Sequence, residues 1–298
     1  MKIAVTGGTG FVGSKIVKKH LDAGDSVRVF TRRKLRGSAS LSYYHGDLTT
    51  SACGLGVFLK DVDTLYHCAC EINNPALMES VNVDGTRRLI EIAMGRVGRV
   101  VYLSSVGVYG KIMDGIVREE TPFNPQNEYE RTKARAEGIV KTFNNHVILR
   151  PSNVYGSGMG NQSLNQMISM IKRGLFFYIG EGAIANYVHV DDVARALYLC
   201  GTHPRAENKD YIVSDYAYMD DFVGKIAQLL GVKNPWLRFP EGPVRAITKH
   251  LERIPKFPLT LNRIDALTTK AVYTYARLAI ELNYRHSTGI FKGLEGMV

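Results

Sequence analysis

The chain has 298 residues, 45% of them hydrophobic and 22% charged, a composition typical of one large globular domain or two fused ones. No apolar run reaches the ~18 residues of a membrane span, so we expect no stable membrane insertion. The net charge of +10 suggests an acidic partner, and since no basic run is interleaved with aromatic residues, we expect a phosphorylated small molecule and no nucleic acid.

Four cysteines, at positions 53, 68, 70 and 200, show no disulfide or zinc spacing. We therefore expect reduced thiols, no metal and a cytoplasmic protein, with Cys68 and Cys70 on one strand. Because Met1 leads straight into a strand, no signal peptide is expected. The basic stretch from Pro243 to Ile254 is compatible with an amphipathic helix on a membrane surface, although a solvated basic face is the simpler interpretation.

The first elements are a strand, a glycine turn and a helix. Ile3 to Val5 are apolar and partly β-branched, as in a buried parallel strand, and from Phe11 apolar residues recur at helical spacing. Between them lie Gly7, Gly10 and Gly13, where the missing Cβ lets the backbone turn tightly and approach a ligand. Amide groups and the positive helix end would face a diphosphate, as in dinucleotide-binding folds. A turn that binds nothing is the disfavoured alternative.

From Ser26 to Thr31 apolar and polar residues alternate, which predicts a second strand. The residues at the end of this strand bear on which cofactor is bound. A fingerprint that selects NAD places an acid there for the ribose hydroxyl groups. This chain has Thr31, followed by Arg32 and Arg33, whose guanidinium groups suit a 2′-phosphate. We therefore predict a preference for NADP(H), with NAD(H) possible; a solvated basic loop is the alternative.

Strands alternate with helices from here on, which predicts an α/β fold with a doubly wound parallel sheet. We expect a Rossmann domain over residues 1–154, joined by segments near 186–202 and 211–216, and a smaller C-terminal α/β lobe, mainly substrate-binding, over 155–298. Asp191 or Asp192 should cap a helix from Val193 to Cys200. The further strands are Leu41 to His45, Val62 to Cys68, Val97 to Leu103 and Val147 to Arg150, and the helices are Pro75 to Met94 and Asn127 to Phe143.

The second of these helices carries Tyr129 and Lys133, which lie four residues apart and so share a helix face. A free tyrosine has a pKa of about 10, and a neighbouring ammonium favours the phenolate and lowers that pKa. The pair can then move a proton at a hydroxyl while hydride moves at the adjacent carbon. Ser105, at the end of a predicted strand, can position the same oxygen. Isolated His67 and His189 fit structural roles better than metal binding.

These motifs, in this order, resemble the extended short-chain dehydrogenase/reductases, which include nucleotide-sugar epimerases, dehydratases and reductases. The similarity runs from Met1 to about Cys200. The matching pieces are Thr6 to Gly13, Gly46 to Leu48, His67 to Ala69, Asn82 to Thr86, Leu103 to Gly110, Tyr129 with Lys133, Leu149 to Gly156 and Val188 to Asp192.

The resemblance implies catalytic roles for Ser105, Tyr129 and Lys133, with Ser105, Tyr129 and Asn153 at the substrate. It also implies a homodimer formed through the two helices named above. The expected cofactor-binding residues are Gly7, Thr9, Gly10, Phe11, Val12, Gly13, Arg32, Arg33, Asp47, Leu48, Cys68, Ala69, Cys70, Tyr129, Lys133 and Pro151.

Three departures from the family pattern bear on the reaction. Ala185 and Asn186 stand where many nucleotide-sugar members carry Arg-Asp, Arg32 replaces the acid that holds NAD, and no acidic pair follows Ser105, which disfavours dehydration. We expect an oxidoreductase or epimerase that acts on a nucleotide sugar at a carbinol or ketone carbon. The alternatives are a reductase or dehydrogenase of an apolar ketone or alcohol, like dihydroflavonol reductases and hydroxysteroid dehydrogenases, and a non-catalytic NADP-binding regulator.

Overall fold

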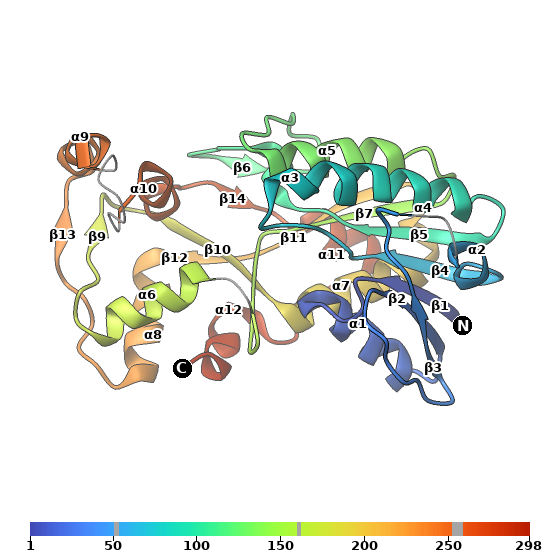
Figure 1. Cartoon of the computed structure of the whole chain (residues 1–298). Coiled ribbons are helices and arrows are strands. Elements are labelled where there is room, and N and C mark those ends of the chain that lie inside the picture. The colour runs from blue at the N-terminus through green and yellow to red at the C-terminus, as the bar shows by residue number, and fades with distance from the viewer. Residues whose placement is uncertain (51–53, 160–161, 252–258) are drawn as a thin grey trace.

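The computed structural model describes residues 1–50, 54–159, 162–251 and 259–298. A seven-stranded parallel sheet with the order β11-β7-β5-β4-β1-β2-β3 forms its centre (Figure 1). Its inner strands are apolar runs, because helices bury both faces. The strands are β1 (Lys2–Thr6), β2 (Ser26–Thr31), β3 (Leu41–His45), β4 (Val62–His67), β5 (Val97–Leu103), β7 (His146–Pro151) and β11 (Lys209–Val213).

Helices cover both faces of this sheet and confirm the predicted doubly wound α/β fold. On one face, α1 (Phe11–Asp22), α7 (Val190–Thr202) and α11 (Ala276–Leu282) share one apolar core with the strands. On the other, α2 (Leu55–Phe58), α4 (Gly85–Ala93) and α5 (Glu128–Val140) share a second core. Ile16 and Leu197 are fully buried in the first core, and Leu89 and Ala136 in the second. This layering holds the carboxyl ends of the strands in a fixed arrangement.

The helix predicted from Pro75 to Met94 is one helical run with a wider turn inside it. It consists of α3 (Pro75–Met78), a π-helical turn (Glu79–Asp84) and α4. A π-turn adds a residue to the helical turn and so changes which side chains face inward. Asn82 in this turn is buried although it is polar. The turn thus places an amide side chain inside the protein.

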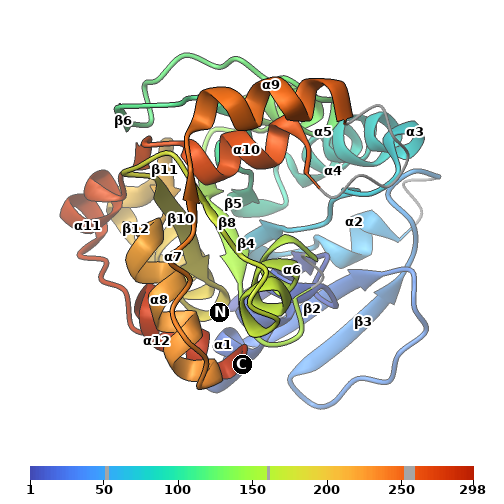
Figure 2. The same ribbon diagram turned by 90° about the vertical axis from the view of Figure 1, so that its left-hand side faces the viewer.

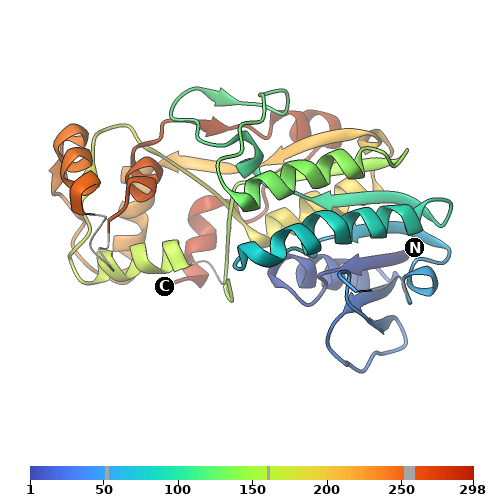
Figure 3. The same cartoon turned by 45° about the horizontal axis from the view of Figure 1, so that its top comes forward.

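A second group of elements lies beyond the carboxyl ends of the sheet (Figures 1 and 3). It is built around the three-stranded sheet β12-β10-β8 and has an apolar core of its own. Two short strand pairs, β9 with β13 and β6 with β14, complete it. Its elements are β6 (Ile116–Val117), β8 (Asn153–Tyr155), α6 (Gln162–Lys172), β9 (Tyr178–Ile179), β10 (Ile184–His189), β12 (Asp215–Tyr218), α8 (Met219–Leu230), β13 (Arg238–Phe239), α9 (Glu241–Leu251), α10 (Leu261–Thr268), β14 (Val272–Tyr273) and α12 (Gly289–Lys292).

The start of α7 differs from the prediction. The helix begins at Val190, and the capping residue is His189, whose ring nitrogen accepts a hydrogen bond from the Asp191 amide at 3.3 Å. The predicted caps, Asp191 and Asp192, therefore both lie inside the helix. The imidazole nitrogen does here what a carboxylate does at other helix starts, since either group can accept from the free amides.

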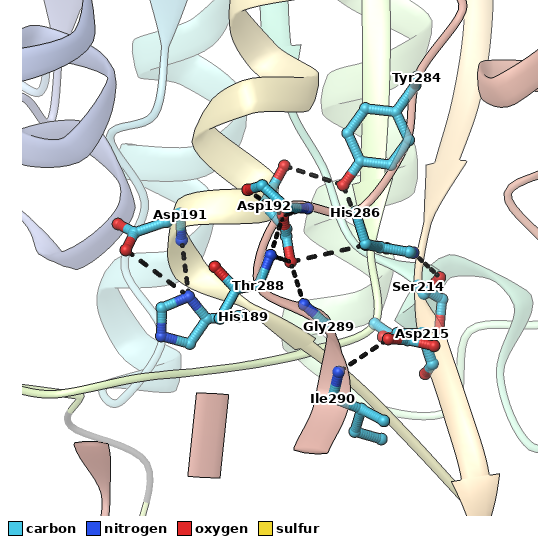
Figure 4. Close-up of polar contacts among 12 residues, drawn as sticks. His189, Asp191, Asp192, Ser214, Asp215, Tyr284, His286, Thr288, Gly289 and Ile290 are labelled. Atoms are coloured by element: carbon cyan, nitrogen blue, oxygen red, sulfur yellow. Dashed lines mark hydrogen bonds and ion pairs between the residues drawn. The ribbon is translucent and has the colours of Figure 1, made fainter. Parts of the chain in front are cut away.

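Asp192 instead binds a segment almost a hundred residues further along the chain (Figure 4). Its buried carboxylate accepts the backbone amides of Ser287 at 2.6 Å and Gly289 at 3.0 Å, and the Ser287 hydroxyl at 2.8 Å. The His286 ring lies 3.7 Å away. Asp215 likewise accepts the Ile290 amide at 2.8 Å. Two acids thus fasten the C-terminal segment to α7 and β12.

Candidate active site

The glycine turn after β1 leaves no room for side chains. Gly7 has a φ of +69°, and a Cβ there would lie 2.6 Å from the Ala69 amide nitrogen at the end of β4. A Cβ on Gly13 would collide with the Gly7 carbonyl oxygen. Gly10 precedes α1 and brings no side chain to its first turn, so the amides of Phe11 and the next residues are available to a ligand. This cradle suits the diphosphate of a dinucleotide.

The predicted basic residues follow β2 directly. Arg32 and Arg33 are exposed, and the Arg33 amide donates to the Thr31 hydroxyl at 3.1 Å. Arg32 lies near two carboxylates, those of Asp47 and Glu71, and its positive charge contributes to lowering the pKa of both. Hydrogen bonds from Thr49 are the largest cause at Asp47, and backbone hydrogen bonds at Glu71. Glu71 is an acidic neighbour that the sequence pattern did not reveal.

Leu48, predicted with Asp47 to bind the cofactor, is largely buried in the core beneath α4. Its carbonyl oxygen accepts a hydrogen bond from the Arg88 guanidinium. Asp47 itself accepts the Thr49 amide and hydroxyl, both at 2.8 Å. The loop after β3 is therefore fixed by local hydrogen bonds and by Arg88 of α4.

Three side chains converge from β5 and α5. Ser105 follows β5, hydrogen-bonds the phenol of Tyr129 and accepts the Gly107 amide at 3.0 Å. Lys133 is 3% exposed, and its ammonium donates to the Leu103 carbonyl at 2.7 Å. The same ammonium lies 4.6 Å from the centre of the Tyr102 ring. Because one helix turn separates Tyr129 from Lys133, the lysine charge acts on the phenol.

The electrostatic balance at Tyr129 differs from the prediction. Burial raises the pKa of Tyr129, and the Lys133 ammonium and the Ser105 hydrogen bond act against this without outweighing it. Burial also acts to lower the pKa of Lys133, but Cys70, Tyr102 and Tyr129 overcome it and the pKa is raised. In the protein without ligand, Tyr129 is therefore a phenol and Lys133 a cation.

The loop after β4 lies between the glycine turn and this group. Burial raises the pKa of the Cys68 thiol to about 12, and Cys70 lies beyond the strand, so the prediction that both cysteines belong to it was wrong. The buried Asn82 side chain accepts the Glu71 amide at 2.8 Å and donates to the Glu71 carbonyl at 3.0 Å. It also donates to the Thr132 hydroxyl at 3.2 Å, so the loop is attached to α5. Cys53 lies outside the described residues.

The histidine at the end of β4 has a structural role, as the sequence suggested. His67 joins the Thr6 hydroxyl at 2.7 Å and the Thr86 hydroxyl at 2.8 Å. Burial, with a smaller effect of Lys133, lowers its pKa to about 3, so the ring is neutral. Within the described ranges, no three His, Cys, Asp or Glu side chains form a group that could hold a metal ion.

A cavity of about 530 Å³ lies beyond the ends of β7 and β10. Asn153 lines it and donates to the Asn186 carbonyl at 3.1 Å, while Pro151 ends β7 just before it. Ser105 and Tyr129 are not among the described residues that line this cavity, whereas Gly110 to Met113 do line it. Much of the wall is apolar, from Met167, Met170, Phe176, Phe177, Tyr187 and Met219.

The charged groups of this wall are already paired in part. Lys111 lies 2.6 Å from Asp265, which also binds Arg245 at 2.7 Å. Arg263 donates to the Gln166 side chain at 2.6 Å. A ligand that enters here would meet apolar surface, amides and cations that already have partners.

The fold combines a parallel sheet, a glycine turn after β1, and a serine, a tyrosine and a lysine near the carboxyl end of β5. Together these features define an NAD(P)-dependent enzyme of the extended short-chain dehydrogenase/reductase class. The NAD dependent epimerase/dehydratase family model matches residues 3–214, and the chain belongs to this family. No helix within the described ranges is long and apolar enough to cross a membrane.

Named relatives point to more than one chemistry. The chain is 27% identical over 232 residues to a UDP-glucose 4-epimerase of Vibrio cholerae, covering 72% of this chain and 70% of the relative. It is 28% identical over 274 residues to short-chain dehydrogenase/reductase family 42E member 1 of Xenopus laevis, covering 80% and 70%. Among solved structures, MoeE5 in complex with UDP-glucose and NAD matches with a TM-score of 0.76 and 25% identity, covering 99% of this chain and 97% of that one.

Proposed function

We propose that the protein transfers hydride between a nicotinamide cofactor and a carbinol or ketone carbon, with Tyr129 as the acid/base. The observation that supports this most is the convergence of Ser105, Tyr129 and Lys133 beside the glycine turn. When bound, the cofactor supplies or accepts the hydride. The side chains of the protein handle the proton.

In the reducing direction, the carbonyl carbon gains hydride while the carbonyl oxygen takes the phenol proton of Tyr129, which gives the alcohol and a phenolate. Lys133, fixed by the Leu103 carbonyl, stabilises this phenolate through its charge. Ser105 holds the reacting oxygen by a hydrogen bond. Oxidation of the alcohol runs through the same steps in reverse.

The glycine turn and the loop after β4 would hold the cofactor. The amides of Phe11, Val12 and Gly13 would face its diphosphate, since the Gly10 amide donates to the Gly7 carbonyl at 2.9 Å, and Ala69 packs against the turn, where a side chain on Gly7 would not fit. We propose that Arg32 and Arg33 favour NADP(H) through its 2′-phosphate. Titration with NADPH and NADH separately tests this. Loss of the NADPH preference in Arg32→Ala would support it, and a preference for NADH in the unmodified protein would overturn it.

The substrate we propose is a nucleotide sugar. The named epimerase relative and the MoeE5 complex with UDP-glucose support it, together with Asn153 at the cavity. In this proposal residues 155–298, apart from α7, β11 and α11, are the substrate-binding lobe. A nucleoside diphosphate should then raise the melting temperature of the cofactor-bound protein.

An apolar ketone or alcohol is the second candidate, favoured by the apolar cavity wall and by Ala185 within it. An arginine at position 185 would have offered a cation to a diphosphate, and alanine offers none. Thermal protection by a steroid, with none from uridine or guanosine diphosphate, would decide for this candidate.

Tyr129→Phe separates the enzyme from a non-catalytic cofactor-binding protein. Removing a general acid lowers turnover by roughly 10²–10⁴-fold. The phenyl ring fills the same buried space, so NADPH should bind with nearly unchanged affinity. Unchanged biological activity of this variant would refute the catalytic role.

A further inference from the structure

β9 and β13 lie at the end of the molecule farthest from β3 and α2 (Figures 1 and 2), and a cluster of apolar side chains on and next to these strands is exposed. β9 and β13 pair there, and the Tyr178 amide donates to the Leu237 carbonyl at 2.9 Å. This pairing joins the segment after α6 to the segment before β13. We call the cluster the distal patch; it consists of Leu175, Trp236, Leu237 and Phe239, which are 60%, 86%, 40% and 39% exposed.

The patch is a built surface and not a frayed end. The Phe239 ring packs edge-on against Phe177 at 5.3 Å between centroids. Arg238 lies between Leu237 and Phe239 in the sequence. Its guanidinium is 4.6 Å from the centre of the Tyr178 ring and is paired with Asp220. Backbone hydrogen bonds from Tyr178 and Gly180 hold Leu237 and Phe239, and Leu175 and Trp236 lie on the adjoining segments. Single exposed apolar residues are common on proteins, but four on two paired segments indicate a contact surface.

Cations border this patch. Lys172 and Arg173 end α6 just before Leu175, and Lys233 precedes Trp236 by three residues; all three are exposed. Against a second copy of the chain, these charges would face like charges and repel. Against anionic phosphate groups they would be attracted, while the apolar side chains enter the acyl boundary. An indole with one apolar body and one polar N–H suits such an interface.

We propose that the distal patch docks the protein peripherally on an anionic lipid surface. This inference is independent of the proposed function, since it needs neither the substrate nor the cofactor to be as proposed. It also differs from the basic helix expected at Pro243 to Ile254, part of which lies outside the described residues.

Trp236 is the only tryptophan of the chain, so its fluorescence reports on the patch directly. We expect vesicles of phosphatidylcholine mixed with phosphatidylglycerol to shift its emission to the blue and to co-sediment the protein. Vesicles of phosphatidylcholine alone should do so much less. Added salt should weaken the binding, because the cations act by electrostatic attraction.

Charge removal gives the quantitative test. A cation near an anionic membrane contributes about 1 kcal/mol, or about fivefold in partitioning. Lys172→Gln with Arg173→Gln should therefore weaken binding roughly 25-fold. Val57→Ser with Lys60→Gln, exposed positions near α2 at the opposite end, is the matched control and should leave binding unchanged.

Three results would overturn the proposal. They are the absence of an emission shift with anionic vesicles, an equal loss of binding in the control variant, and an emission shift that depends on protein concentration without vesicles. The last would assign the patch to a second copy of the chain. An unchanged melting temperature in every variant would show that the fold is retained.

Discussion

Replacing Asp192 by asparagine should destabilise the protein by about 2–4 kcal/mol. The carboxylate is fully buried, and one oxygen accepts the Ser287 amide and hydroxyl while the other accepts the Gly289 amide. The Thr288 amide lies 3.3 Å from both oxygens. In asparagine one of these oxygens becomes an NH₂ group, which cannot accept. Each oxygen accepts at least two hydrogen bonds from part-buried donors, so the asparagine loses at least two of these bonds, at roughly 1–2 kcal/mol each.

The free energy of unfolding, measured in urea, tests this against Asp191→Asn. The Asp191 carboxylate is 49% exposed and pairs with Lys15 at 2.9 Å, so its removal should cost less than about 1 kcal/mol. Equal losses in the two variants would refute the reasoning, because they differ mainly in burial and in the number of donors.

The pH dependence gives a second check on Asp192. Burial acts to raise its pKa, but hydrogen bonds from His286, Ser287 and Gly289 outweigh it and hold the pKa well below its ordinary value. The unfolded chain titrates near pH 3.9, so the stabilisation is present above about pH 4 and is lost as the pH falls below it. The stability gap between the native protein and Asp192→Asn should therefore be constant near pH 7 and shrink below pH 4.

Three more predictions concern the core, the glycine turn and the acid/base. The Glu137 carboxylate is buried and lies 2.6 Å from Arg150, so Glu137→Ala should lower the free energy of unfolding, measured in urea, by about 3–5 kcal/mol; a loss below about 1 kcal/mol would contradict this. Gly13→Ala should abolish NADPH binding in titrations, whereas Gly56→Ala, where a Cβ meets nothing within 4 Å, should leave it intact; equal affinities would refute the cradle. Because burial raises the pKa of Tyr129, kcat/KM for ketone reduction should show no decline due to Tyr129 below about pH 10, and a Tyr129-dependent fall between pH 7 and 8 would refute this.

The sequence predicted the elements that depend on local patterns. The strands of the central sheet were recognised because buried parallel strands are short apolar runs bounded by turn residues. The glycine turn was recognised because Gly7, Gly10 and Gly13 fall between a strand pattern and a helix pattern, and the structure leaves no room for a Cβ on Gly7 or Gly13. The convergence of Ser105 with Tyr129 followed from their places at a strand end and on one helix face.

What the sequence did not reveal depends on contacts between distant segments. Asn82 in the π-turn hydrogen-bonds the Glu71 backbone and Thr132 of α5. A sequence window of ten residues around Asn82 contains neither partner. The role of Asp192 depends on residues 287–289. The net pKa shift of Tyr129 depends on burial, a property of the whole fold.

The fastening of the C-terminal segment has a consequence for the order in which the protein forms during synthesis. β11, the edge partner of β7, is made after β7 and α7, and the amides that bind the Asp192 carboxylate follow Asp192 by 95 and 97 residues. Until then the Asp192 carboxylate, in the first turn of α7, lacks the amides that donate to it. In the same period β7 has an open edge. Contacts this remote in sequence are slow to form. The nascent chain therefore lacks this stabilisation until residues 287–289 are made, and loss of that segment would leave α7 without the donors that bind Asp192.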